Sequence, residues 1–250
     1  MSILSKVGVQ DSLNITSLTD DSGHTLIHRA AYDNTVRISE YLLLYYKQRL
    51  SAHLRQKEAY RLGPGANPDE LGPDVLESIK KEVRQTVAEW INTPSRSEEG
   101  FYPMHFASFH GNVKLIKLLY KNGANIWVRN KQGINMLHVA AQGDQPYSLT
   151  YFREKGLSIN STDDEQSTPL HWACFAGSDT ASYYLQSWGC KVNAQDNVGN
   201  TPLHLAVRSA EHWPNTRAIK ELLIKGASRS MTEETGLRPV DLIEEIKDND

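Results

Sequence analysis

A four-residue pattern that recurs every thirty-three residues constrains this chain more than any other feature. Thr168-Pro-Leu-His171 returns thirty-three residues later as Thr201-Pro-Leu-His204. The same step backwards reaches Asn135-Met-Leu-His138 and then Tyr102-Pro-Met-His105. A chain that repeats itself at this period folds as a row of similar small units rather than around one central core.

Two less regular copies extend the row towards both ends. Thr25-Leu-Ile-His28 lies seventy-seven residues before His105, which is one period plus forty-four residues. Arg238-Pro-Val-Asp241 lies thirty-seven residues after the copy before it, so four residues are inserted there. A glycine stands ahead of five copies in one register, and Gln166 takes its place in the remaining copy. The sequence therefore contains six imperfect units.

Each repeated position has a physical reason to be there. The Thr side chain can cap a helix, and Pro at the first helical position loses no hydrogen bond. The second helix of a unit carries aliphatic pairs such as Leu118-Leu119, and a glycine after it suits a left-handed helix end. Small side chains in the first helix let neighbouring units approach closely; they are Ala107, Ala140, Ala141, Ala173, Cys174 and Ala206.

The pattern resembles the ankyrin family, whose repeat has thirty-three residues and a T-P-L-H-x-A signature. The resemblance covers residues 20–61 and 97–247. It implies an all-α repeat solenoid, an ankyrin stack of about six units with short β-hairpin turns and one helical insertion. The expected order is a lead segment at 1–19, a first unit at 20–46, a helical insertion at 47–96, and units two to six at 97–250, the last incomplete.

The insertion is predicted to be a helical arm. No Gly or Pro interrupts the chain between Val36 and Leu62, which favours one helix of roughly 40 Å. A second helix is expected from Asp74 to Ile91, because apolar residues recur on one face of it. That face either binds a partner helix or packs on Leu43, Leu50 and Leu54; we favour the packing.

The sequence offers little support for catalysis, cofactors or metal binding. The repeated histidines lie one unit apart, too far for shared ligation, and each is expected to hydrogen-bond backbone in its own turn. Cys174 and Cys190 are interpreted as buried core residues, and two cysteines in this length fit a reducing compartment. Nucleotide-binding and zinc-protease motifs are missing. We expect no enzyme activity, no cofactor and no metal.

Charge and hydropathy narrow the partners to proteins. The net charge is -3 and the basic residues are scattered, so nucleic-acid binding is not expected. No run of eighteen apolar residues is present, so this segment is not expected to enter a membrane. The first residues lack the apolar core of a signal peptide, which favours the cytoplasm or the cytosolic face of a membrane.

The predicted working surface is the concave groove of the stack. In the ankyrin family, turn tips and the exposed end of each first helix commonly contact ligands. At these positions the sequence places apolar or aromatic residues where polar ones are usual, and such residues anchor protein interfaces. Acidic tips near Glu98 and Asp164 favour a ligand with basic character. The candidate partner-binding residues are Phe101, Phe109, Ile134, Trp172 and Phe175.

Residues 136–241 are also similar to a narrower family, the protist ankyrin-type Asp-His-His-Cys palmitoyltransferases. The similarity is carried by Leu137-His-Val-Ala-Ala-Gln-Gly-Asp, by Leu170-His-Trp-Ala-Cys-Phe and by Trp188-Gly. In that family the repeats face the cytosol and recruit substrates as extended segments, and the tryptophan of Leu-His-Trp-Ala takes part, which implies Trp172. The chain has no Asp-His-His-Cys motif, and its last unit shows one helix at 240–247. It is either part of a longer protein or a stand-alone relative.

The leading prediction is a module that binds a partner protein or extended peptide in the groove and catalyses nothing itself. One alternative is the substrate-recruiting domain of a membrane palmitoyltransferase. Another is a structural subunit of a larger assembly, docked through the helical insertion. The sequence identifies neither the partner nor the oligomeric state.

Overall fold

The computed structural model of the protein describes residues 16–212 and 216–243. The chain divides into two compact units. Unit 1 contains the described residues up to Pro103 together with Lys114–Asn125. Unit 2 contains Met104–Val113 and the described residues from Ile126 onward. Part of the expected lead segment, residues 1–15, and part of the expected last helix, residues 244–247, lie outside the described residues.

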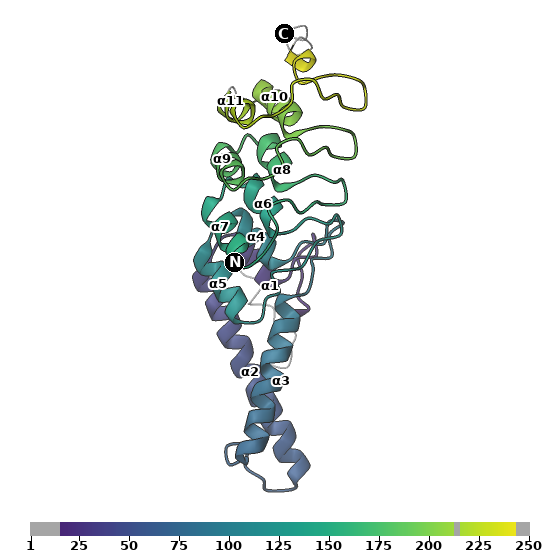
Figure 1. Ribbon diagram of the computed structural model, residues 1–250. Helices are drawn as coiled ribbons and strands as arrows, with labels where there is room; N and C mark the ends of the chain where they lie inside the picture. The colour runs from purple at the N-terminus through teal and green to yellow at the C-terminus, as the bar shows by residue number, and fades with distance from the viewer. Residues whose placement is uncertain (1–15, 213–215, 244–250) are drawn as a thin grey trace. The chain divides into compact units, whose positions relative to one another are not determined.

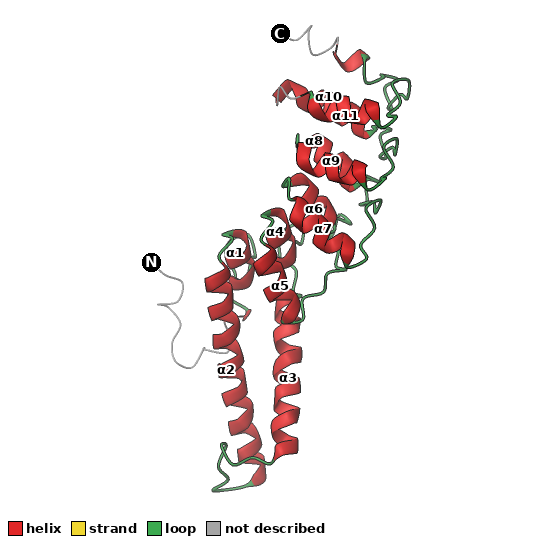
Figure 2. Cartoon of the chain, turned by 60° about the vertical axis from the view of Figure 1, so that its left-hand side comes forward, coloured by secondary structure: helices red, strands yellow, loops and turns green. Residues whose placement is uncertain are grey.

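Unit 1 holds the first helix pair and the arm. Its helices are α1 (Leu26–Tyr32), α2 (Val36–Leu62), α3 (Pro73–Ile91) and most of α5 (Val113–Lys121). Figure 2 shows α2 and α3 side by side along the arm, and the two helices pack on each other. The predicted bounds of α2 are confirmed at both ends, and α3 begins one residue before the predicted Asp74.

The arm is held together by the apolar face that the sequence places on α3. Ile79, Val87 and Trp90 of α3 are buried. Leu50 and Leu54 of α2 are buried as well. The ring of Tyr46 on α2 meets the Trp90 ring edge-on, with centroids 5.1 Å apart. The expected packing of the two faces is therefore confirmed, and it follows from the hydrophobic effect acting on two amphipathic helices.

Unit 2 is a stack of helix pairs. In Figure 1, α6/α7, α8/α9 and α10/α11 follow one another, with the connecting turns on one side. α6 packs on α8 and α8 on α10, so the first helices form a continuous layer. The side chains at these contacts are small and buried: Ala140, Ala173 and Ala206 are at most 2% exposed. The bounds are α4 (Pro103–Phe109, mostly in this unit), α6 (Met136–Gln142), α7 (Pro146–Glu154), α8 (Pro169–Phe175), α9 (Asp179–Ser187), α10 (Pro202–His212) and α11 (Arg217–Ile224).

The turns between units are tight and stack on each other. In one turn the N–H of Asp163 donates to the carbonyl of Ser167, and Asp163 Oδ1 accepts from the Ser167 N–H. The N–H of Asn197 in the next turn donates to the Glu165 carbonyl. The glycine register ahead of each helix has positive φ, and Gln166 in that register also adopts φ 57°. Among the described residues these turns form hairpins without extended strands, apart from one isolated bridge between Thr19 and Thr25.

No helix within the described ranges is long and apolar enough to cross a membrane.

Candidate functional site

A histidine in the first helix of each ankyrin repeat links that repeat to the turn of the next one. His171 Nδ1 accepts from the N–H of Thr168, the residue that caps its own helix, at 3.1 Å. Its Nε2 lies 3.1 Å from the carbonyl oxygen of Asn200 in the following turn. A carbonyl only accepts, so Nε2 carries the proton and Nδ1 is the acceptor. The expected bond within the turn is confirmed, and the second bond to the next turn was not predicted.

The same arrangement recurs along the chain. His28, His105, His138 and His204 place Nε2 3.1–3.2 Å from the carbonyls of Phe101, Ile134, Ser167 and Leu237. Burial lowers the pKa of His28 and His105 to about 4 and that of His138 to about 3. These imidazoles are therefore neutral structural links, in keeping with the large cost of burying a charge.

A cleft of about 410 Å³ opens in unit 2 between α8, α10 and the two turns that precede them. Its volume is typical of ligand-binding pockets. Apolar side chains from successive units face it, and acidic residues of the turns border it. The residues that line it include Gln142, Glu165, Trp172, Phe175, Val198 and Leu205.

Trp172 is fixed in this cleft by a buried carboxylate. Its indole Nε1–H donates to Asp163 Oδ2 at 2.8 Å, and Asp163 is only 6% exposed. The Trp172 ring also meets the His138 ring edge-on, with centroids 6.1 Å apart. The ring is half-buried, so one part of it is held by the unit and the rest faces the cleft.

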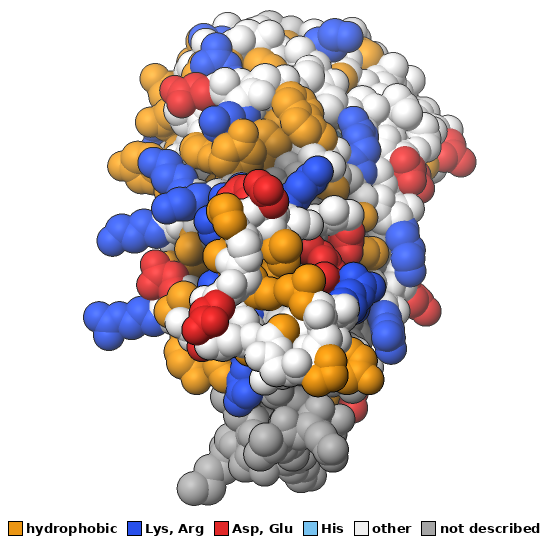
Figure 3. Space-filling model, turned by 90° about the horizontal axis from the view of Figure 1, so that it is seen from below, with side chains coloured by type: hydrophobic (Ala, Val, Ile, Leu, Met, Phe, Trp, Pro, Cys, Tyr) orange, Lys and Arg blue, Asp and Glu red, His pale blue; other side chains and the backbone are white. Residues whose placement is uncertain are grey.

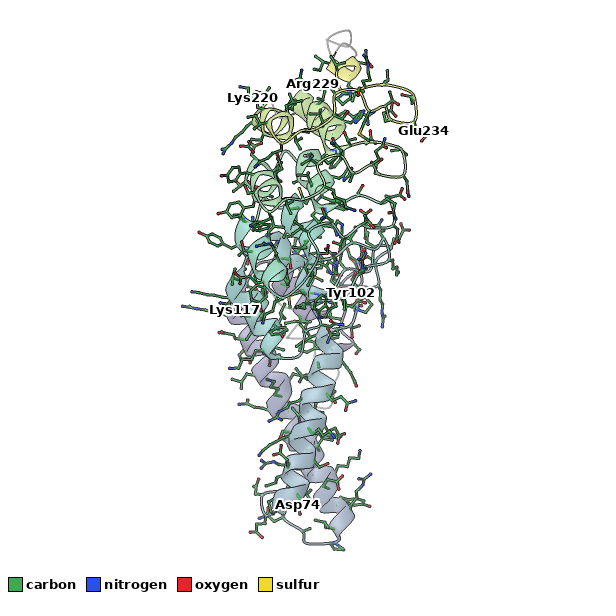
Figure 4. The ribbon with its side chains drawn as sticks, viewed as in Figure 1. Asp74, Tyr102, Lys117, Lys220, Arg229 and Glu234 are labelled. Atoms are coloured by element: carbon green, nitrogen blue, oxygen red, sulfur yellow. The ribbon has the colours of Figure 1, made fainter. Side chains whose placement is uncertain are left out.

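Phe175 and Val198 are the exposed apolar side chains of the cleft. Phe175 at the end of α8 is 65% exposed, and Val198 at the tip of the next turn is 43% exposed. Glu165 is exposed at the neighbouring tip, where its side chain has one long contact of 3.5 Å with Asn197 Nδ2. Figure 4 labels Glu234, which lies at the tip of the turn that follows α11 and is not among the residues that line the cleft. The cleft thus combines apolar surface with negative charge.

The structure brings together some of the predicted site residues and separates others. Trp172 and Phe175 line one cleft. Phe109 occupies on α4 the position that Phe175 occupies on α8, and it is 39% exposed. Phe101 is half-buried and belongs to unit 1, where its carbonyl accepts from His28.

The predicted exposure of Ile134 in the groove is wrong, because only 3% of this residue is exposed. Its N–H donates to Asn130 Oδ1, and its carbonyl receives the Nε2–H of His105. Both bonds draw this turn position inward, beneath the tip. An apolar residue here is therefore part of the core.

Leu205 and Asp196 line the cleft but were not predicted. Leu205 lies one period after Trp172, and Asp196 lies one period after Asp163. The repeat register alone would have identified both, since equivalent positions of neighbouring units face the same side.

Nucleophilic and metal chemistry receive no support from the described part of the chain. No group of three His, Cys, Asp or Glu side chains within it could hold a metal ion. Burial raises the pKa of Cys174 and of Cys190 to about 12, so both remain protonated thiols near neutral pH.

We expect both thiols to resist an aromatic disulfide reagent at pH 8 while the protein is folded, because the thiolate is the reactive form. Labelling should proceed at once in 6 M guanidinium chloride, which serves as the control. The absorbance of the released aromatic thiol measures the extent of labelling. Rapid labelling of one cysteine in the folded protein would show that its environment is more open than described.

The helix-pair stack, the turn geometry and the histidine links define a repeat protein of the ankyrin type. Models of ankyrin repeats match residues 137–233 and residues 104–150. The chain belongs to the ankyrin-repeat family.

Individual relatives match shorter parts of the chain. The Notch-regulated ankyrin repeat-containing protein of Xenopus tropicalis is 38% identical over 29% of this chain and 63% of its own length. Protein phosphatase 1 regulatory subunit 27 of Homo sapiens is 29% identical over 38% of this chain and 64% of its own. The poly [ADP-ribose] polymerase tankyrase of Caenorhabditis elegans is 30% identical over 35% of this chain but 4% of its own. The chain therefore spans less than two thirds of each of these relatives.

Proposed function

We propose that this protein is a protein-interaction module that binds an extended segment of a partner protein in the unit 2 cleft and has no catalytic activity of its own. The observation that carries the proposal is the exposed Phe175 beside the half-buried Trp172, in a cleft bordered by Glu165. Exposed aromatics in a formed cleft are the usual anchors of protein interfaces. The name of one relative, a regulatory subunit of protein phosphatase 1, agrees with an interaction role.

The chemistry of the cleft favours a segment that carries Lys or Arg next to an apolar residue. The carboxylate oxygens of Asp163 and Asp196 already accept hydrogen bonds from turn N–H groups and from the side chains of Trp172 and Asn200. The exposed carboxylate of Glu165 is the one best placed to receive a cation, while Phe175, Val198 and Leu205 receive the apolar side chain. Aromatic faces also attract cations directly.

A more specific version of this proposal is the recruitment of substrates for a palmitoyltransferase. The position of Trp172 at the cleft supports this version, because the resemblance to that family implies that this tryptophan takes part in substrate recruitment. In this version the module works in the cytoplasm or at the cytosolic face of a membrane. Docking through the arm is less favoured, because the apolar face of α3 is occupied by α2.

Replacing Phe175 by Ala should weaken binding about tenfold or more, because it removes an exposed anchor without disturbing the core. The probe is a twelve-residue peptide selected from a random display library on the full chain, and fluorescence anisotropy measures its affinity. We expect Lys or Arg beside an apolar residue in the selected peptides. Trp172→Ala and Phe109→Ala extend the map, with Trp172→Ala expected to act as strongly as Phe175→Ala.

Tyr147→Ala is the matched control, since Tyr147 is 77% exposed on α7 and does not line the cleft. It should leave affinity unchanged. Glu165→Lys should weaken binding of the same peptide and reduce its salt dependence. Selected peptides whose affinity is the same for Phe175→Ala, Trp172→Ala and Tyr147→Ala would place binding outside the cleft and overturn the proposal.

A further inference from the structure

A second cavity, of about 640 Å³, lies in unit 1 between the two helices of the arm. Four basic side chains line it, Lys47 and Arg55 from α2 and Lys80 and Arg84 from α3. Asp69 in the loop between the helices is the one acidic residue of the lining. Figure 3 views the molecule from below and shows Lys and Arg side chains interspersed with Asp, Glu and hydrophobic side chains. The cavity therefore gathers more positive than negative charge.

The positive charges of the cavity are poorly compensated within the described residues. Arg55 Nη1 is 3.6 Å from Asp69 Oδ1, but its buried Nε has no hydrogen-bond partner there. Arg84 has neither an ion pair nor a hydrogen bond in the described part of the chain. Lys80 contacts Glu77 at 3.3 Å, but both side chains are more than 60% exposed, so this pair contributes little.

Lys47 adds to this excess of charge. Its Nζ donates to Asn122 Oδ1, a neutral acceptor, so that bond supplies no counter-charge. Burial lowers the pKa of Lys47, and the positive charges of Lys121 and Arg84 lower it further. A buried donor without a partner costs free energy, as do like charges held together. An anion in the cavity would relieve both.

We propose that the cavity between α2 and α3 binds a small, multiply phosphorylated molecule. Arginine presents a planar fork of N–H donors that fits phosphate oxygens, and lysine supplies a mobile positive charge. Gln48, Ser51 and Gln56 line the same cavity and can hydrogen-bond hydroxyl groups of a phosphorylated polyol. The volume suits a small ligand.

Phosphate fits this cavity better than the carboxylates of an acidic peptide. A phosphate monoester carries about -1.5 to -2 charges near neutral pH, so two or three such groups balance the four basic residues. An acidic peptide would need four side chains, each on its own length of backbone. The cavity also contains apolar surface from Ala52 and Val83, against which a compact ring can pack.

The test is isothermal titration calorimetry of the full chain with inositol hexakisphosphate as the probe at physiological salt. Binding by the wild type should weaken about tenfold in Arg84→Gln, since a hydrogen-bonded charge pair is lost. Arg84→Gln should melt at the same or a higher temperature without ligand, because it relieves repulsion of Lys47. A defect in folding would instead lower the melting temperature of the variant. Arg61→Gln is the control; Arg61 is on α2, pairs with Glu58 and does not line the cavity.

Two further arms identify the source of the phosphate groups. Vesicles of phosphatidylcholine that contain about 5 mol% phosphatidylinositol bisphosphate test binding to a lipid headgroup in a sedimentation assay. Binding to the free probe or to the vesicles supports the proposal, if Arg84→Gln weakens it and Arg61→Gln does not. A short poly-glutamate peptide that binds as tightly as hexakisphosphate overturns the phosphate assignment. No binding to either phosphate source, or equal losses in both variants, overturns the site. The outcome is independent of peptide binding in unit 2.

Discussion

Acidification from pH 7 to pH 5 is expected to lower the free energy of unfolding of unit 2 by roughly 4 kcal/mol through His105 and His138 alone. The pKa of His105 is lowered to about 4 and that of His138 to about 3, from an unfolded value of 6.5. Their neutral forms therefore stabilise the fold fully above pH 6.5, and this stability is lost as the pH falls towards 4. Each histidine contributes about 1.4 kcal/mol per pH unit in that window. Urea unfolding followed by circular dichroism at pH 7, 6 and 5 measures the loss.

A single replacement should separate these histidines from other acid effects. His138→Gln removes one titrating group, so the pH dependence between 6.5 and 5 should become shallower by about 1.4 kcal/mol per unit. The variant should also be less stable at pH 7, because the Ser167 carbonyl and the Asn135 N–H lose their partner. His53→Gln, at an exposed position of α2, is the matched control variant. Identical slopes for His138→Gln and the wild type would contradict the assigned role.

Gly143→Ala should destabilise unit 2 by about 3 kcal/mol, as overpacking in a closed site does. Gly143 follows α6 with φ -80°, so its backbone conformation suits any residue. A Cβ there would lie only 2.1 Å from the carbonyl oxygen of Phe109 in the preceding unit of the stack. The glycine is thus required by the close approach of two backbones and not by φ. Thermal or urea unfolding measures the effect.

Gly72→Ala provides the comparison for this substitution. Gly72 also has negative φ, and a Cβ built on it would meet nothing within 4 Å. It should change stability by less than about 1 kcal/mol, the scale of a helix-cap effect. If the two alanine variants were equally stable relative to the wild type, the spacing of α4 and α6 would have to be wider than described.

The fold was predictable because its signals are local and repeated. The period fixes which residues are equivalent, and the chain without Gly or Pro between Val36 and Leu62 sets the length of α2. The burial of Leu50 and Leu54 followed from helical periodicity. The second bond of each histidine was not predictable in the same way, because its acceptor is a backbone carbonyl in another unit. No side chain marks such an acceptor in the sequence.

The site was predictable only in part. Trp172 and Phe175 were selected because large apolar residues stand at positions that face the groove in this family, and both line the cleft. Ile134 was misassigned because the turn position before the helix cap folds inward when its carbonyl meets His105. The cavity of the arm was missed altogether. Lys47 and Arg84 lie on different helices, and only the packing of α2 on α3 brings their charges together.

The long α2 gives unit 1 a mechanical property. The same uninterrupted helix packs on α1 at its start and forms one half of the arm further on. A straight helix of this length extends roughly 40 Å and bends little, so a load applied near Gly63 acts on α1 as through a rigid lever. A force on an object attached to the arm would be transmitted as torque to the first ankyrin unit and would not be absorbed by a hinge.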